Sequence, residues 1–318
     1  NAVNIARYAT KRRGVICFEG GYHGRTLLTL SLTSKHGLFK KGFGPFAGDL
    51  YRLQAPNVYR KPDPMTEAEY VDFCIRKLRE ALISQVDPSD LAAILIEPVQ
   101  GEGGFIPMPK AFLQEIRNIC TETGAVMIAD EIQCGFGRTG KLFACEHYDI
   151  APDIITTAKS LGAGMPISAT VGRADIMAAV HLGGVGGTYG GSPVTCVAAL
   201  EVIREMTKPA FLAHATRVGE IMTQRMNVWK EKYPWVGDVR GLGPMRLVEF
   251  VKDRSTREPD PDITLKIIKD AVAHGVVLIR AGLFSNGIRL LPPLVITEEQ
   301  LHEGLDVLEA SIAKGMNS

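Results

Sequence analysis

Three polar residues each stand directly after a short apolar run, where a buried strand would end. Glu97 follows Ala-Ala-Ile-Leu-Ile, Asp130 follows Ala-Val-Met-Ile-Ala, and Lys159 follows Ile-Ile-Thr-Thr-Ala. In a sheet of parallel strands, ligands bind in the crevice beyond the carboxyl ends of the strands. The sequence therefore predicts that these three side chains share one crevice. Any one of them alone is more often just the polar end of a strand, so the combination matters.

Asp130 and Lys159 together have the chemistry that a pyridoxal cofactor requires. A lysine amine binds the aldehyde of such a cofactor, and a carboxylate keeps its pyridine nitrogen protonated, so that the ring can accept electrons from a carbanion. We expect apolar neighbours to shift the Lys159 amine toward its neutral, nucleophilic form. Gln133 lies three residues after Asp130 and is placed to donate to the phenolic oxygen of the cofactor.

Several stretches of the chain resemble the class III aminotransferases in their order and spacing, across nearly the whole length. They are Gly21–Thr26 (GYHGRT), Glu97–Gly104 (EPVQGEGG), Asp130–Gly140 (DEIQCGFGRTG), Ala158–Gly162 (AKSLG) and Gly187–Gly191 (GTYGG). The resemblance implies an α/β protein of fold type I, the aspartate-aminotransferase type. It also implies a homodimer or higher oligomer with the active site at the subunit interface.

The resemblance assigns further residues to a pyridoxal 5′-phosphate cofactor. Tyr22 would stack on one face of the ring, although a role as a core tyrosine competes with this interpretation. Thr188 would reach the phosphate held by the neighbouring subunit. Ile132, Glu97 and His23 would complete the cofactor contacts, with His23 as an orienting residue rather than a base.

Three charged residues are implied in substrate recognition. Arg25 and Arg289 would bind substrate carboxylates, for which the guanidinium group is well shaped. Glu102 would act as a switch that covers the charge of Arg289 while an ω-amino acid is bound and moves away for an α-carboxylate. The alternative is a surface ion pair that contributes little.

The implied reaction is transfer of an amino group from 4-aminobutyrate to 2-oxoglutarate. Three alternatives stay open. Ornithine or acetylornithine transamination would use the same catalytic residues, and an amino-acid racemase or epimerase would share Lys159 and Asp130 without needing a 2-oxo acid. A catalytically inactive oligomeric binding protein is the third, and the intact set of Lys159, Asp130 and Gln133 argues against it.

The elements that must position these residues follow an α/β pattern. Short β-branched runs alternate with longer amphipathic stretches, which predicts a mainly parallel sheet covered by helices. Capping boxes at Thr66 with Glu69 and at Thr297 with Gln300 predict the starts of two helices. The segments in question are Gly14–Phe18, Glu67–Ile83, Ala92–Ile96, Ala111–Thr121, Ala125–Ala129, Ile154–Ala158 and Ala169–Val171.

The pattern changes after about Met206. A long helical stretch from Phe211 to Lys232 is followed by β-rich sequence from Val236 to Phe250 and a helix–strand–strand–helix tail. We therefore expect a large cofactor-binding domain over residues 1–208 and a smaller α+β domain over residues 209–318.

The first residues already follow helical spacing, at Ala2, Ile5, Ala6 and Ala9, without a capping residue. We expect that an upstream segment is missing. The small-residue turn with which the family binds the cofactor phosphate should lie there, just before Asn1.

Composition excludes several classes of partner. The net charge of +1 gives no broad basic surface for nucleic acid. The six cysteines and seven histidines have no metal-site spacing, and the cysteines are typical of reduced core thiols in a cytoplasmic protein. Ile176–Leu200 carries no Asp, Glu, Lys or Arg but six glycines and Pro193, which predicts a flexible loop rather than a membrane span.

Gly135–Gly140 matches the G-x-G-x-x-G pattern of dinucleotide-binding proteins. Such a turn should open an amphipathic helix, whereas Lys141–Pro152 has no clean helical stripe. A nucleotide-phosphate loop is equally disfavoured, because no G-x-x-x-x-G-K-[ST] is present.

Overall fold

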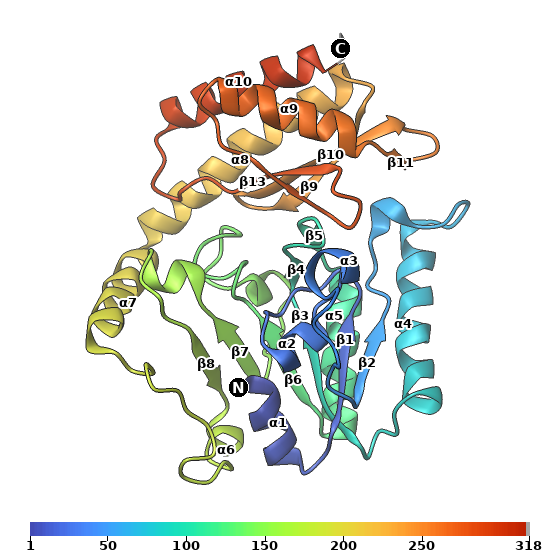
Figure 1. Ribbon diagram of the computed structural model, residues 1–318, viewed down its shortest axis with the longest axis vertical. Coiled ribbons are helices and arrows are strands. Elements are labelled where there is room, and N and C mark those ends of the chain that lie inside the picture. The colour runs from blue at the N-terminus through green and yellow to red at the C-terminus, as the bar shows by residue number, and fades with distance from the viewer. Residues whose placement is uncertain (316–318) are drawn as a thin grey trace. The chain divides into compact units, whose positions relative to one another are not determined.

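The computed structural model describes residues 1–315, which form two compact units (Figure 1). The second unit takes in two short segments from within residues 1–208, and one of them is held there by Arg138, whose Nη1 donates to the carbonyl of Pro292 at 2.6 Å. The first unit comprises Asn1–Pro98, Met108–Phe136 and Phe143–Met206, and the second comprises Val99–Pro107, Gly137–Leu142 and the chain from Thr207 onward.

The first unit is built on a six-stranded sheet in the order β2-β1-β3-β6-β7-β8. Neighbouring strands are parallel except β7 and β8, which are antiparallel. β1, β3 and β6 are buried along their whole length, as expected of apolar strands covered on both faces. The predicted α/β fold with a mainly parallel sheet is confirmed. The strands are β1 (Gly14–Phe18), β2 (Leu50–Leu53), β3 (Leu91–Ile96), β6 (Val126–Asp130), β7 (Ile154–Thr157) and β8 (Ala169–Gly172).

The first helix of this unit packs on the sheet through an apolar stripe. α1 contributes Val3, Ile5 and Ala6 to a core cluster shared with β1, β3 and β6. The capping box of α4 is confirmed, because Glu69 N donates to Thr66 Oγ1 at 3.3 Å and Thr66 N donates to Glu69 Oε2 at 2.7 Å. The helices are α1 (Ala2–Thr10), α2 (Leu27–Leu32), α3 (His36–Phe39), α4 (Glu67–Ser84), α5 (Lys110–Thr123), α6 (Ala174–Met177) and α7 (Pro193–Met206), with 3₁₀ turns at Val58–Arg60, Ala144–His147 and Lys159–Gly162.

The loop predicted for Ile176–Leu200 is partly wrong, because α7 begins at Pro193. Proline suits the first turn of a helix, where its missing N–H would have had no partner. Val194, Val197 and Leu200 then continue at helical spacing. The chain between α6 and α7 is irregular, and residues 181–191 are exposed throughout.

The second unit is an antiparallel sheet covered on one face by α8, α9 and α10 (Figure 1). Its core gathers apolar side chains from these helices around Trp229 and Phe250, both fully buried. The capping box of α10 is confirmed by Gln300 N, which donates to Thr297 Oγ1 at 3.2 Å. The elements are β4 (Val99–Gln100), β5 (Ile106–Pro107), α8 (Pro209–Lys232), β9 (Val236–Leu242), β10 (Met245–Asp253), β11 (Glu258–Pro259), α9 (Pro261–Ala273), β12 (Ile279–Ala281), β13 (Gly287–Leu290) and α10 (Glu298–Lys314).

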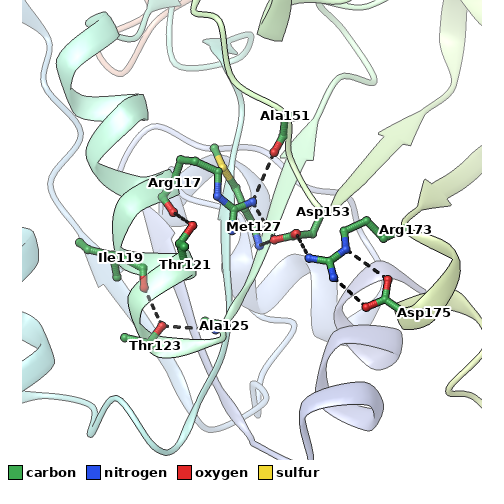
Figure 2. A network of polar contacts seen from close by, with 10 residues as sticks. All are labelled: Arg117, Ile119, Thr121, Thr123, Ala125, Met127, Ala151, Asp153, Arg173 and Asp175. Atoms are coloured by element: carbon green, nitrogen blue, oxygen red, sulfur yellow. Dashed lines mark hydrogen bonds and ion pairs between the residues drawn. The ribbon is translucent and has the colours of Figure 1, made fainter.

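Asp153 ties the first unit together at the amino-terminal end of β7 (Figure 2). Its side chain is only 6% exposed. Oδ2 accepts from Arg117 Nη1 on α5 and from Met127 N on β6, each at 2.8 Å, and Oδ1 accepts from Arg173 Nη1 at 3.0 Å. One buried carboxylate therefore joins a helix to two strands and to the residue that follows β8.

Replacing Asp153 with asparagine is expected to lower the free energy of unfolding by about 3 kcal/mol, because both arginines lose a buried charge partner. Urea unfolding followed by circular dichroism measures this. Asp175 is a matched control, since its carboxylate pairs with Arg173 but is 64% exposed. Asp175→Asn should leave the midpoint unchanged, and equal midpoints for the two variants would contradict the role of Asp153.

No helix within residues 1–315 is long and apolar enough to cross a membrane. All six cysteines are free, as predicted, and five of them are buried, whereas Cys196 is half-buried.

Candidate active site

Glu97, Asp130 and Lys159 lie at the carboxyl ends of three neighbouring parallel strands, as the sequence predicts. Glu97 follows β3, Asp130 is the last residue of β6, and Lys159 comes two residues after β7. β3 pairs with β6 and β6 pairs with β7, with Asp130 opposite Thr156. The strand order thus gives the first unit one edge at which these three residues gather.

Asp130 is buried, with 7% of its side chain exposed, and is held by three donors. Thr156 Oγ1 donates to Oδ1 at 3.1 Å and Ile132 N donates to the same oxygen at 3.2 Å. His23 Nδ1 donates to Oδ2 at 2.8 Å. A carboxylate offers about four lone-pair sites, so Oδ2 can accept one further hydrogen bond. This remaining acceptor position on a carboxylate suits a cationic N–H, such as that of a protonated pyridine nitrogen.

His23 reaches Asp130 from the segment between β1 and α2. Its side chain is 3% exposed, and its backbone N–H donates to Thr33 Oγ1 at 2.9 Å. Thr33 Oγ1 in turn donates to the carbonyl of Thr29 at 2.9 Å. The histidine is therefore fixed at both its backbone and its ring, which supports an orienting role.

Lys159 has an unusual backbone for a residue with a side chain, with φ of 45° in the left-handed region. Such a conformation costs about 1–3 kcal/mol. The side chain is exposed, and within residues 1–315 its amine forms no hydrogen bond or ion pair. In the single chain Lys159 therefore does not pack among apolar neighbours, contrary to the prediction.

Tyr22 is positioned through Glu97. Glu97 Oε2 accepts the backbone N–H of Tyr22 at 2.9 Å, and Glu97 is only 6% exposed. The Tyr22 ring stands edge-on to Phe39, with centroids 5.1 Å apart. The guanidinium carbon of Arg25, which is exposed, lies 5.0 Å from the centroid of the same Phe39 ring. Phe39 thus holds two of the predicted site residues.

Glu131 anchors the turn that carries Gln133. It is fully buried and accepts from Ala144 N at 3.0 Å, Cys145 N at 2.8 Å and Cys134 Sγ at 3.0 Å. Burial raises the pKa of the Glu131 carboxyl, while these donors oppose the rise. The buried Glu131 side chain therefore closes the turn after β6. Gln133 itself is half-buried.

Glu102 and Arg289 form an ion pair within the second unit. Glu102 Oε1 accepts from Arg289 Nη1, and the two side chains are 25% and 17% exposed. Arg289 lies within β13 and pairs across to Leu247 of β10 and Ile279 of β12, so its position is set by the sheet. The predicted partners are therefore brought together.

Thr188 stands apart from the other predicted residues. It is exposed in the irregular segment before α7. No hydrogen bond links it to another predicted site residue in the described part of the chain.

The chain matches the model of the family described as Aminotransferase class-III over residues 1–312. It is 46% identical over 312 residues to the probable 4-aminobutyrate aminotransferase of Bacillus subtilis, covering 98% of this chain and 72% of that protein. It is 41% identical over 314 residues to the 5-aminovalerate aminotransferase of Pseudomonas putida, covering 99% of this chain and 72% of that protein.

Solved structures agree with these relatives. The ω-transaminase from Pseudomonas jessenii in complex with PMP superposes with a TM-score of 0.92 at 26% identity, covering 99% of this chain and 72% of that chain. The likeness thus extends over both units of the described chain.

Proposed function

This chain belongs to the class III aminotransferases, and on that premise we propose that it transfers the amino group of 4-aminobutyrate to 2-oxoglutarate. The products are succinate semialdehyde and glutamate. The observation that carries the proposal is the position of Asp130. Three donors hold its carboxylate on the strand next to β7, and β7 leads to Lys159, whose amine has no partner within residues 1–315. The choice of donor is supported by the relative in Bacillus subtilis.

Pyridoxal 5′-phosphate is the cofactor we assign. When bound, it supplies an electron sink for the carbanion that forms at the amine-bearing carbon of the donor. Asp130 keeps the ring nitrogen protonated through the free acceptor position on Oδ2. His23 and Thr156 orient that carboxylate, Tyr22 stacks on the ring, and Gln133 donates to the phenolic oxygen. Ile132 and Glu97 complete the cofactor contacts, and Thr188 contacts the phosphate of a neighbouring subunit.

Lys159 has two tasks in this proposal. Its amine holds the cofactor covalently in the resting enzyme. With the donor bound, the same amine would be the group that carries the proton from the amine-bearing carbon to the cofactor side. The exposed side chain and the absence of an ion-pair partner within residues 1–315 leave the Nζ free to move between these positions.

Substrate carboxylates are recognised by Arg25 and Arg289. Glu102 neutralises Arg289 while 4-aminobutyrate, which has no α-carboxylate, is bound. When 2-oxoglutarate or glutamate binds, its α-carboxylate takes the place of Glu102 on the guanidinium. The ion pair between Glu102 and Arg289 supports this switch.

Glu102→Ala is expected to raise KM for 4-aminobutyrate about tenfold, or about 1.4 kcal/mol, because Arg289 then faces the donor without a counter-charge. KM for 2-oxoglutarate should be unchanged or lower. Steady-state kinetics of both half-reactions measures the split. Glu258→Ala, which removes an exposed carboxylate paired with Lys252, is the control. Wild-type kinetics for Glu102→Ala in both half-reactions would eliminate the switch.

The second candidate donor is 5-aminovalerate, because the relative in Pseudomonas putida is named for it. An assay tests the choice: incubate the protein with pyridoxal phosphate and 2-oxoglutarate, and supply 4-aminobutyrate, 5-aminovalerate, ornithine or acetylornithine in turn. Glutamate should form fastest with 4-aminobutyrate. Inversion of a chiral amino acid without a 2-oxo acid would instead indicate a racemase.

We further assign the protein to a homo-oligomer with the active site at the subunit interface. Val194, Val197 and Leu200 of α7 form an apolar stripe and are 66%, 60% and 53% exposed, with Leu182 and Tyr189 exposed nearby in the sequence. Exposed apolar patches of this kind mark interaction sites. Sedimentation velocity should give a dimer or tetramer, and Val197→Glu should shift it toward the monomer. A monomeric wild-type protein would contradict the assignment.

The free thiols fit a cytoplasmic location.

A further inference from the structure

The backbone of the segment that carries Glu102 is tied to the second unit on both sides of that residue. The carbonyl of Glu102 accepts from Gly282 N at 3.1 Å. Two residues later, the carbonyl of Gly104 accepts from Arg240 Nε at 2.8 Å. The Glu102 side chain is held less firmly than this backbone, because Arg289 is its one hydrogen-bond partner within residues 1–315. The main chain is fixed, and the side chain is held by a single exchangeable contact.

Arg240, which binds the Gly104 carbonyl, is itself held firmly in place. It lies on β9, opposite Leu247 of β10, and its side chain is 11% exposed. Nη1 lies 2.6 Å from Glu249 Oε2 and 3.1 Å from Asp238 Oδ2. Glu249 is 5% exposed at its side chain. The guanidinium is thus locked by two carboxylates while its Nε remains directed at the Gly104 carbonyl.

Only glycine suits position 104, where the backbone passes close to Arg240. Its φ of +117° is strained for any residue with a side chain. A Cβ at this position would lie 2.9 Å from Arg240 Nη2 and 3.1 Å from the Cα of Gly282. Any side chain would therefore push the segment away from both of its anchors.

We propose that Arg240 and Gly104 act as positioning residues for substrate selection: they fix the backbone of residues 101–104 so that Glu102 stands opposite Arg289. This inference rests on the proposed switch between Glu102 and Arg289. The exchange of carboxylates on Arg289 then needs only rotation of one side chain, because the main chain stays in place. The two residues touch neither substrate nor cofactor.

Two variants test the clamp formed by Arg240 and Gly104. Arg240→Lys keeps a charge beside Glu249 but has no Nε for Gly104, and Gly104→Ala changes no charged residue. Each should reproduce the signature of Glu102→Ala: KM for 4-aminobutyrate rises about tenfold, whereas kcat and KM for 2-oxoglutarate change little. Combined with Glu102→Ala, neither should raise KM further, because contacts that act through one residue are not additive.

Arg246→Lys is the matched control. Arg246 also donates to backbone carbonyls of the second unit, Gly243 at 2.8 Å and Gly241 at 2.9 Å, but forms no hydrogen bond with residues 101–104 in the described chain. It should keep wild-type KM values. If Arg246→Lys shows the same KM split, or if folded Arg240→Lys and Gly104→Ala keep wild-type kinetics while Glu102→Ala does not, the clamp is refuted. If Glu102→Ala itself is unchanged, the proposed switch fails instead. Near-UV circular dichroism verifies that each variant folds. If Arg240→Lys does not fold, the kinetics of Gly104→Ala alone test the clamp.

Discussion

Replacing Lys159 with alanine is expected to lower kcat for transamination at least about 1000-fold. The variant loses both the covalent hold on the cofactor and the group that moves the proton at the donor carbon. Affinity for the cofactor should fall by much less, since Asp130 and the stacking residue remain. Single-turnover absorbance of protein loaded with pyridoxal phosphate measures the rate, and equilibrium dialysis measures the binding.

Added methylamine should restore part of the activity of Lys159→Ala, because a small amine can replace the missing proton carrier. Lys77→Ala is the control, since Lys77 is an exposed lysine of α4 that pairs with Glu80. It should behave like wild type. Near-normal turnover of Lys159→Ala without an added amine would show that another group moves the proton.

Asp130→Asn is the second large effect, and we expect kcat to fall about 100- to 1000-fold. Asparagine has almost the same shape but no charge to keep the pyridine nitrogen protonated, so the ring becomes a weaker electron sink. The visible absorption band of the bound cofactor should shift as well. That shift is a readout that loss of stability alone would not produce.

Thr156→Val should weaken the same site to a smaller extent than Asp130→Asn. It removes one of three donors to the carboxylate, and the loss of one hydrogen bond, about 1 kcal/mol, predicts a rate about fivefold lower. Thr157→Val is its control, because Thr157 is buried on the same strand but does not donate to Asp130. A wild-type rate and spectrum for Asp130→Asn would remove Asp130 from the ring nitrogen.

The strand ends were predictable because the signal is local. An apolar run that stops at a charged residue marks both the strand and its end, so Glu97, Asp130 and Lys159 could be assigned from sequence. Their neighbours could not. Thr156 reaches Asp130 only through the register between β6 and β7, and Phe39 meets Tyr22 across seventeen positions of irregular chain and short helices.

Two misjudged features have physical explanations. Lys159 was expected among apolar neighbours but is exposed, and the residue type gives no sign of its left-handed backbone. The start of α7 was hidden by the glycines before it, although Pro193 followed by apolar residues at helical spacing was an available sign. Arg240 was missed because its partners lie far along the chain, at Gly104 and Glu249.

The proposed reaction requires that the amine of Lys159 carries the cofactor and gives it up to an amino donor. Borohydride reduction of the protein after incubation with pyridoxal 5′-phosphate, followed by peptide mass spectrometry, tests this directly. We expect a phosphopyridoxyl label on Lys159 that disappears after prior treatment with 4-aminobutyrate and returns when 2-oxoglutarate is added. A label on another lysine, or one on Lys159 that 4-aminobutyrate leaves intact, would contradict it.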